Sequence, residues 1–163
     1  MKIVRLQSTN VKRLKAVEVT PDGKLALTAD HGNAGGSGGR IYTVSVIDLE
    51  ASPPRVINKV IFGDAPEGLA INPNGNIAVA ILRHGSNNAT SDWSYNRNGI
   101  VVVLKIDGKE VSKVGEVEVR GLPEGVVFSP DGNWLNVGNY NGSDMSVLRV
   151  DGDRVTNTGT LVK

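Results

Sequence analysis

VSVIDLEASPPRVINKVIFGDAPEGLAINPNG, residues 44–75, is the stretch that decides the fold. Two segments rich in β-branched residues flank a Ser-Pro-Pro break, and a third apolar segment ends in a Pro-Asn-Gly turn. The second half recurs as LPEGVVFSPDG at residues 122–132, and a weaker copy, LKAVEVTPDG, occupies residues 14–23. A unit that recurs in this way predicts a repeat architecture.

Short strands separated by tight turns account for nearly the whole chain, and no segment has apolar residues at helical spacing. Proline presets φ and glycine accepts positive φ in the three Pro-Asx-Gly turns, while two Asp-Gly pairs at residues 107–108 and 151–152 favour hairpins. The expected strands are 16–20, 25–29, 41–49, 56–62, 68–72, 77–82, 99–106, 111–119, 125–129, 134–138, 145–150 and 155–162.

The spacing of the repeats predicts an all-β fold, a β-propeller of three four-stranded antiparallel blades. A blade usually takes about 40–45 residues, and two inserted loops, His31–Arg40 and Arg83–Asn98, explain the longer first and second units. We expect one partial-propeller domain, residues 1–163, with blades at about 14–63, 64–120 and 121–163. One extra strand, Lys2–Gln7, precedes them.

The repeat resembles the YVTN family of β-propeller repeats. The residues that carry the resemblance are VSVID at 44–48, VIFG at 60–63, PEGLAINPNG at 66–75, PEGVVFSPDG at 123–132 and WLNVGN at 134–139. It covers most of the chain from Ala16 onward and implies the propeller fold. Family members include surface-layer-like proteins, binding proteins and relatives of lactonases, and they usually have seven blades where this chain has three.

Composition and charge exclude several classes of function. Lys and Arg number 18 against 17 Asp and Glu, so a net charge of +1 gives no bulk attraction to nucleic acid or to an anionic membrane. The absence of cysteine excludes disulfides and thiolate metal sites. The first 15 residues lack the apolar region of a signal peptide. This predicts a cytoplasmic protein, or a periplasmic or extracellular one if a signal was removed.

Both inserted loops are expected on one face of the propeller, together with the Pro-Glu-Gly segments, and function concentrates on such loops. Asp92, Trp93 and Tyr95 place two aromatic residues in one polar loop, a pattern suited to stacking on a sugar or anchoring a protein. Trp93 could instead fold back on its own loop. His31 and His84 follow equivalent strands and are further candidates for binding. The glycine-rich loop at residues 31–40 is expected to lack packing contacts.

Glu67 and Glu124 occupy equivalent repeat positions at the axial rim. Converging carboxylates there suit a hard cation such as Ca²⁺, or an acid/base pair. The alternative is that both are solvated residues beside a turn glycine. No cofactor is required by the sequence, and Ca²⁺ is the alternative that this pair keeps open.

The sequence favours a non-enzymatic scaffold that binds a protein or a glycan through its loop-bearing face. Two alternatives remain: a lactonase-like hydrolase with a cation at the axial rim, and a piece of a larger propeller without activity of its own. Three blades cannot close a ring, because propellers typically have about 4–8. Apolar residues in the first and last units, among them Leu25, Leu27, Leu148 and Val150, therefore predict exposed end faces and a homodimer that completes a six-bladed ring.

Overall fold

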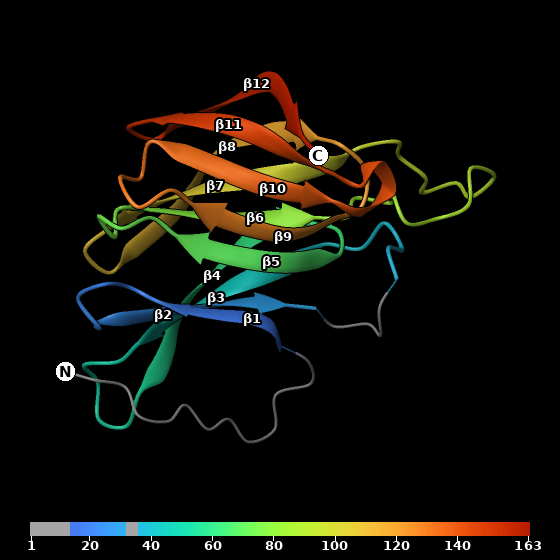
Figure 1. Ribbon diagram of the computed structural model, residues 1–163. Coiled ribbons are helices and arrows are strands. Elements are labelled where there is room, and N and C mark those ends of the chain that lie inside the picture. Colours follow the sequence, from blue (N-terminus) through green and yellow to red (C-terminus); the bar gives the residue numbers. More distant parts are fainter. Residues whose placement is uncertain (1–13, 32–35) are drawn as a thin grey trace.

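In the part of the chain that the structure describes, twelve strands form three four-stranded antiparallel sheets stacked as successive propeller blades (Figure 1). The computed structural model describes residues 14–31 and 36–163, so the expected strand Lys2–Gln7 lies outside the described residues. The first sheet contains β1 (Leu14–Val19), β2 (Leu25–Asp30), β3 (Tyr42–Asp48) and β4 (Arg55–Gly63). The second contains β5 (Pro66–Ile71), β6 (Ile77–Leu82), β7 (Gly99–Asp107) and β8 (Glu110–Val119). The third contains β9 (Pro123–Phe128), β10 (Trp134–Asn139), β11 (Asp144–Asp151) and β12 (Arg154–Val162). The predicted all-β partial propeller is confirmed.

Side-chain hydrogen bonds fix the Pro-Asx-Gly turns that join the first two strands of each blade. In the third blade the Ser129 hydroxyl donates to Asp131, whose carboxylate also accepts the backbone N–H of Asn133 at 3.1 Å. These bonds favour the ionised carboxylate, so they hold the pKa of Asp131 below its ordinary value, the Ser129 hydroxyl contributing most. Gly132 takes a φ of 73°, which a residue with a side chain rarely adopts.

The hydrophobic core lies between the sheets in two layers. One layer joins the first and second blades, with Leu27, Val46, Ala80 and Leu104 fully buried in it. The other joins the second and third blades around aliphatic side chains such as Val79. Alternate residues of a strand face alternate layers, a period of two residues, because neighbouring side chains point to opposite sides of a sheet. The middle blade is therefore apolar on both faces.

The end faces differ from the sequence prediction. Leu25, Leu27, Leu148 and Val150 are buried between blades rather than exposed at the ends, because each points toward the middle blade. The outer face of the third blade carries Trp134 instead, 38% exposed.

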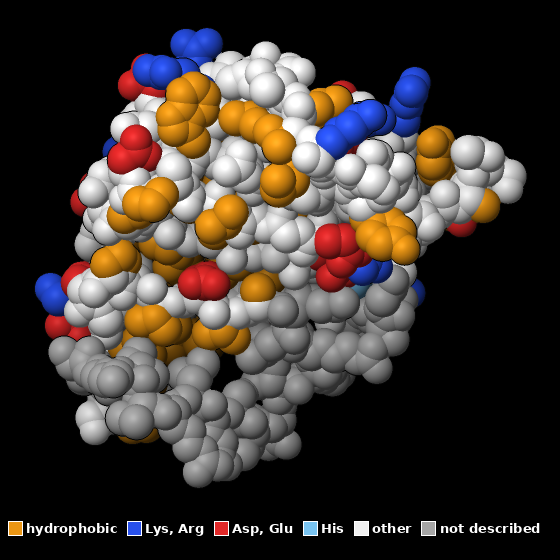
Figure 2. Space-filling model, in the orientation of Figure 1, with side chains coloured by type: hydrophobic (Ala, Val, Ile, Leu, Met, Phe, Trp, Pro, Cys, Tyr) orange, Lys and Arg blue, Asp and Glu red, His pale blue; other side chains and the backbone are white. Residues whose placement is uncertain are grey.

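That outer face is mixed in character. The guanidinium of Arg149 lies 5.5 Å from the centre of the Trp134 ring, a cation–π contact. Trp134 therefore lies on the outer face of the third blade and does not pack between blades. Met145 and Val127 are also exposed there, at 42% and 59%. Hydrophobic side chains are interspersed with charged and neutral polar ones over the side of β9–β11 that faces the reader (Figure 2).

The two long loops project from the same end of the blades, on the right in Figure 1. The β6–β7 loop, the β8–β9 connection and the β10–β11 turn, which contains the 3₁₀ helix η1 (Tyr140–Gly142), all lie at this end. The Asp-Gly hairpins lie at the opposite end. No helix within residues 14–31 and 36–163 is long and apolar enough to cross a membrane.

Candidate functional site

Ser86 ties together the segments that build the loop-bearing face. Its hydroxyl donates to the Arg83 carbonyl at 2.6 Å and accepts the Leu122 N–H at 2.7 Å. Its carbonyl accepts from the Asn141 amide at 3.1 Å. One buried residue thus holds the β6–β7 loop, the β8–β9 connection and the β10–β11 turn in fixed positions. A surface built in this way is pre-organised for binding.

The glycine-rich loop is also held where it is described. Ser37 accepts the Gly85 N–H at 3.0 Å, and its hydroxyl donates to Asn87 at 2.6 Å. The expectation of a loop without packing contacts is wrong for residues 36–39, because backbone groups and one serine supply the contacts that apolar side chains lack. Residues 32–35 lie outside the described residues.

Trp93 is the most exposed large hydrophobic residue of the described chain, at 83%. Its ring lies against Gly39, where a Cβ atom would come within 2.5 Å of the indole. Trp93 therefore rests on the neighbouring loop with most of its surface in solvent. Asp92 stabilises the turn beneath it by accepting the Ser94 hydroxyl at 2.7 Å and the Ser94 N–H at 2.8 Å, bonds that lower the Asp92 pKa. Tyr95, in the same loop, is half-buried.

The two histidines differ in how far they are exposed. His31 is fully buried, and its ring meets Tyr42 edge-on, with 5.0 Å between the ring centres. His31 is therefore closed to solvent in this structure, and its role in binding stays a prediction. His84 is half-buried at the start of the β6–β7 loop, with a φ of 51°.

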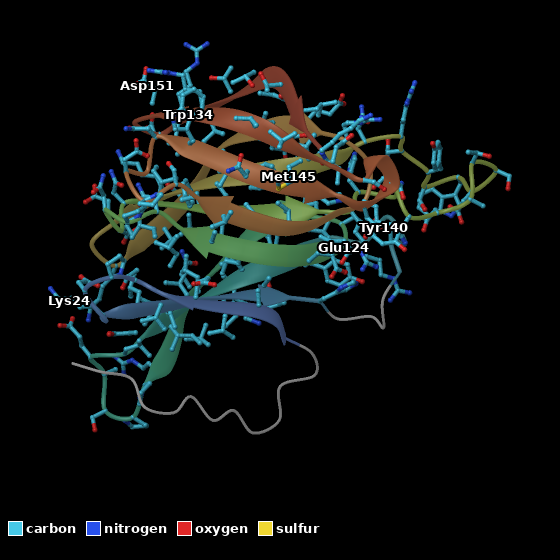
Figure 3. The ribbon with its side chains drawn as sticks, in the orientation of Figure 1. Lys24, Glu124, Trp134, Tyr140, Met145 and Asp151 are labelled. Carbon is cyan, nitrogen blue, oxygen red and sulfur yellow. The ribbon has the colours of Figure 1, made fainter. Side chains whose placement is uncertain are left out.

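Glu67 and Glu124 converge as the repeat predicted, but on an arginine. One terminal nitrogen of Arg83, Nη2, lies 2.8 Å from a Glu67 oxygen and 3.0 Å from a Glu124 oxygen. The Glu67 side chain is 6% exposed and that of Glu124 is 43% exposed. Glu124 lies at the loop-bearing end (Figure 3). A guanidinium here supplies the positive charge that a cation would otherwise supply.

Sequence reasoning missed Arg83, although its place directly after β6 and beside the loop was a usable signal. The described residues contain no group of three or more His, Asp or Glu positioned to hold a metal ion. The Ca²⁺ alternative at Glu67 and Glu124 stays a prediction.

No protein-family model matches the sequence, and no curated protein matches it. Solved structures do. A functionally unknown protein from Desulfotomaculum acetoxidans superposes with a TM-score of 0.70 at 23% identity, over 99% of this chain and 45% of that one. A protein from Lactobacillus plantarum gives 0.61 at 12% identity, over 96% and 43%. The Swd1 β-propeller domain from Myceliophteria thermophila gives 0.58 at 12%, over 91% and 42%.

These likenesses show the fold alone. The chain spans less than half the length of each of these three solved chains. The β-propeller prediction is confirmed, while the narrower resemblance to the YVTN family stays a prediction.

Proposed function

We propose that this protein is a non-enzymatic recognition module whose loop-bearing face binds a glycan or a protein. The observation that carries the proposal is the exposure of Trp93, 83%, on a loop that hydrogen bonds hold in place. An exposed tryptophan offers a partner a large apolar area with a polar N–H, and Trp, Tyr and Arg are enriched among the residues that dominate binding energy at protein interfaces. Tyr95 and Arg97 follow Trp93 in the same loop, and both line an open hollow at this end of the blades.

The hydrolase alternative has less support from the same geometry. A general acid and base need carboxylates that are free to exchange protons with a substrate. Glu67 is 6% exposed and ion-paired to Arg83, which also holds Glu124. Binding at the loops therefore accounts for more of the observed arrangement than catalysis at the axial rim.

Replacing Trp93 by alanine tests the proposal. Because the side chain is largely exposed, we expect the free energy of unfolding to change by no more than about 0.5–1 kcal/mol. Binding to an immobilised panel of oligosaccharides and peptides should fall to background. Trp134→Ala is the matched control, since it removes the same side chain from another face. Equal binding by wild type and Trp93→Ala would contradict the proposal, as would a loss of several kcal/mol, because that would make Trp93 a structural residue.

A further inference from the structure

An open, polar hollow of about 430 Å³ lies beside the aromatic loop, where the second blade meets the third. Small-molecule sites typically measure about 300–1,000 Å³, so the hollow has room for a small ligand. Basic side chains stand out at this end of the molecule (Figure 2). Side chains from the β6–β7 loop, the β8–β9 connection and the β10–β11 turn line the hollow: Tyr95, Arg97, Asn98, Arg120 and Asn141.

The two arginines of the hollow differ in their electrostatic balance. Arg120 is ion-paired to Asp144, whose side chain is fully buried. Asp144 is held in turn by the Asn139 amide at 2.9 Å. Arg97 is exposed and, among the described residues, makes no ion pair. The hollow therefore carries one fixed guanidinium and one whose positive charge is not balanced.

The equivalent junction between the first and second blades supplies its own anion. Ala65 accepts the Arg83 N–H at 2.9 Å just as Leu122 accepts the Tyr140 N–H at 2.9 Å, so Asp64 and Gly121 occupy equivalent positions. The Asp64 carboxylate accepts backbone N–H groups of the glycine-rich loop at Gly38 and Gly39, at 3.4 and 3.0 Å.

Gly121 cannot perform this role at the second junction. A Cβ atom there would lie 2.7 Å from the Arg97 carbonyl oxygen and 3.0 Å from the Asn141 amide nitrogen. The second junction therefore has no acid at this position, although it has arginines on either side.

We propose that this hollow binds the carboxylate of an acidic saccharide, a uronic or sialic acid unit, between Arg97 and Arg120. The planar fork of a guanidinium matches a carboxylate. One N–H of the Asn98 amide is donated to Glu118 at 2.7 Å, and one N–H of Asn141 to the Ser86 carbonyl at 3.1 Å. Each amide keeps its second N–H and its oxygen for sugar hydroxyls, and Tyr95 offers a ring face. Few apolar groups line the hollow, which favours a sugar over an apolar peptide side chain. The inference rests on the proposed function and names the ligand class of that face.

Isothermal titration calorimetry with a galacturonic acid trimer and its fully methyl-esterified form tests the inference. The ester keeps the sugar ring and removes the charge. We expect the acid to bind at least about tenfold more tightly than the ester, and Arg97→Gln to remove about the same factor, because hydrogen bonds to charged groups are the strong ones. Arg40→Gln is the matched control. Arg40 and Arg97 occupy equivalent positions before β3 and β7. Thr43 pairs with Asp30, the last residue of β2, and Ile100 pairs with Leu82, the last residue of β6. Each arginine lies three residues before that pairing residue.

Arg120→Lys keeps the charge and removes the planar fork, and should weaken binding of the acid while the protein stays folded. Equal affinity for acid and ester, or an unchanged affinity in Arg97→Gln, overturns the inference. Tighter binding of a glutamate-rich peptide or of inorganic phosphate than of the acid trimer overturns the saccharide assignment.

The same experiments distinguish failure of the carboxylate site from failure of the proposed recognition function. If both trimers bind equally and Trp93→Ala removes that binding, the recognition module stands and the carboxylate site is wrong. If neither trimer binds, the carboxylate site is wrong, and the panel with Trp93→Ala decides whether the face binds anything.

Discussion

Replacing Arg83 by methionine should destabilise the protein strongly, because Arg83 joins two blades through one ion-paired nitrogen. Methionine retains most of the apolar stem and removes the charge. The Glu67 carboxylate, 6% exposed, then loses the guanidinium 2.8 Å away. Breaking a buried ion pair by removing one partner costs about 3–5 kcal/mol. The second contact, to the half-exposed Glu124, adds less than about 1 kcal/mol.

The measurable consequence is a lower melting temperature. A loss of about 3 kcal/mol in a chain of this length corresponds to a fall in Tm of about 6–12 °C. Differential scanning calorimetry and urea unfolding would both report it. Glu124→Gln is the matched control and should move Tm by no more than about 2–4 °C. The double variant Arg83→Met with Glu67→Gln should recover part of the loss, since it no longer buries a carboxylate that has lost its guanidinium.

Two results would refute this reasoning. A change in unfolding free energy below about 1 kcal/mol for Arg83→Met would mean that the pair contributes no more than a surface pair does. A fall in the wild-type melting temperature on adding chelator would mean that a cation, rather than Arg83 alone, holds the two carboxylates. With Arg83 in place, we expect the wild-type melting curve to be the same with and without chelator.

Two further predictions concern pH and assembly. Burial raises the pKa of the Glu18 carboxyl, so the folded state binds the carboxyl proton more tightly than the unfolded state does. The stability that this proton contributes is complete below the ordinary pKa of 4.5 and is lost as pH rises through the folded-state pKa. Glu18→Gln should therefore raise stability at neutral pH relative to wild type more than it does at pH 4, and equal effects at both would contradict it. We also propose that two chains complete a six-bladed ring, which light scattering would show as a particle of twice 17.2 kDa; a stable, non-aggregating monomer at high concentration would overturn the dimer.

The sequence was a reliable guide to the fold because turns and strands are local. Pro130 and Gly132 have backbone preferences that favour a tight turn whatever the rest of the chain does. Along Ile77–Leu82, successive side chains point to opposite sides of the strand, so alternate residues face the same neighbouring blade. The predicted strands that fall within the described residues agree with the observed ones to within two residues at their ends. The orientation of the end faces was misjudged, because the period of a strand says which residues share a face but not which face points outward.

The candidate site was less predictable because it depends on contacts between loops distant in sequence. No residue close to His31 in the sequence predicts that Tyr42 packs against its ring. Arg97, Arg120 and Asn141 come from three separate connections, and only the folded structure brings them to one hollow. Trp93 was the exception, since a tryptophan in a polar loop is unusual on composition alone.

A buried polar cluster lies next to Arg120 of the hollow, at positions where another blade of this fold has apolar residues. Asn139, Asp144 and Ser146 are buried and joined by two hydrogen bonds of 2.9 Å from the Asn139 amide. In the middle blade the same strand positions are the apolar Leu82, Ile100 and Val102. Those apolar residues pack in the core between blades, so this position in a blade does not need a charge.

Replacing the cluster by the residues of the middle blade separates folding from binding. Exchanging a buried polar network for apolar residues of similar size is often neutral or stabilising. The triple variant Asn139→Leu, Asp144→Ile and Ser146→Val should therefore keep its melting temperature within a few degrees, while Arg120 loses the carboxylate that fixes it. Because the arginine is then free to move, affinity for the galacturonic acid trimer should fall several-fold. Unchanged affinity would mean that Asp144 does not position Arg120 for a ligand, and unfolding would mean that the cluster serves the blade interface itself.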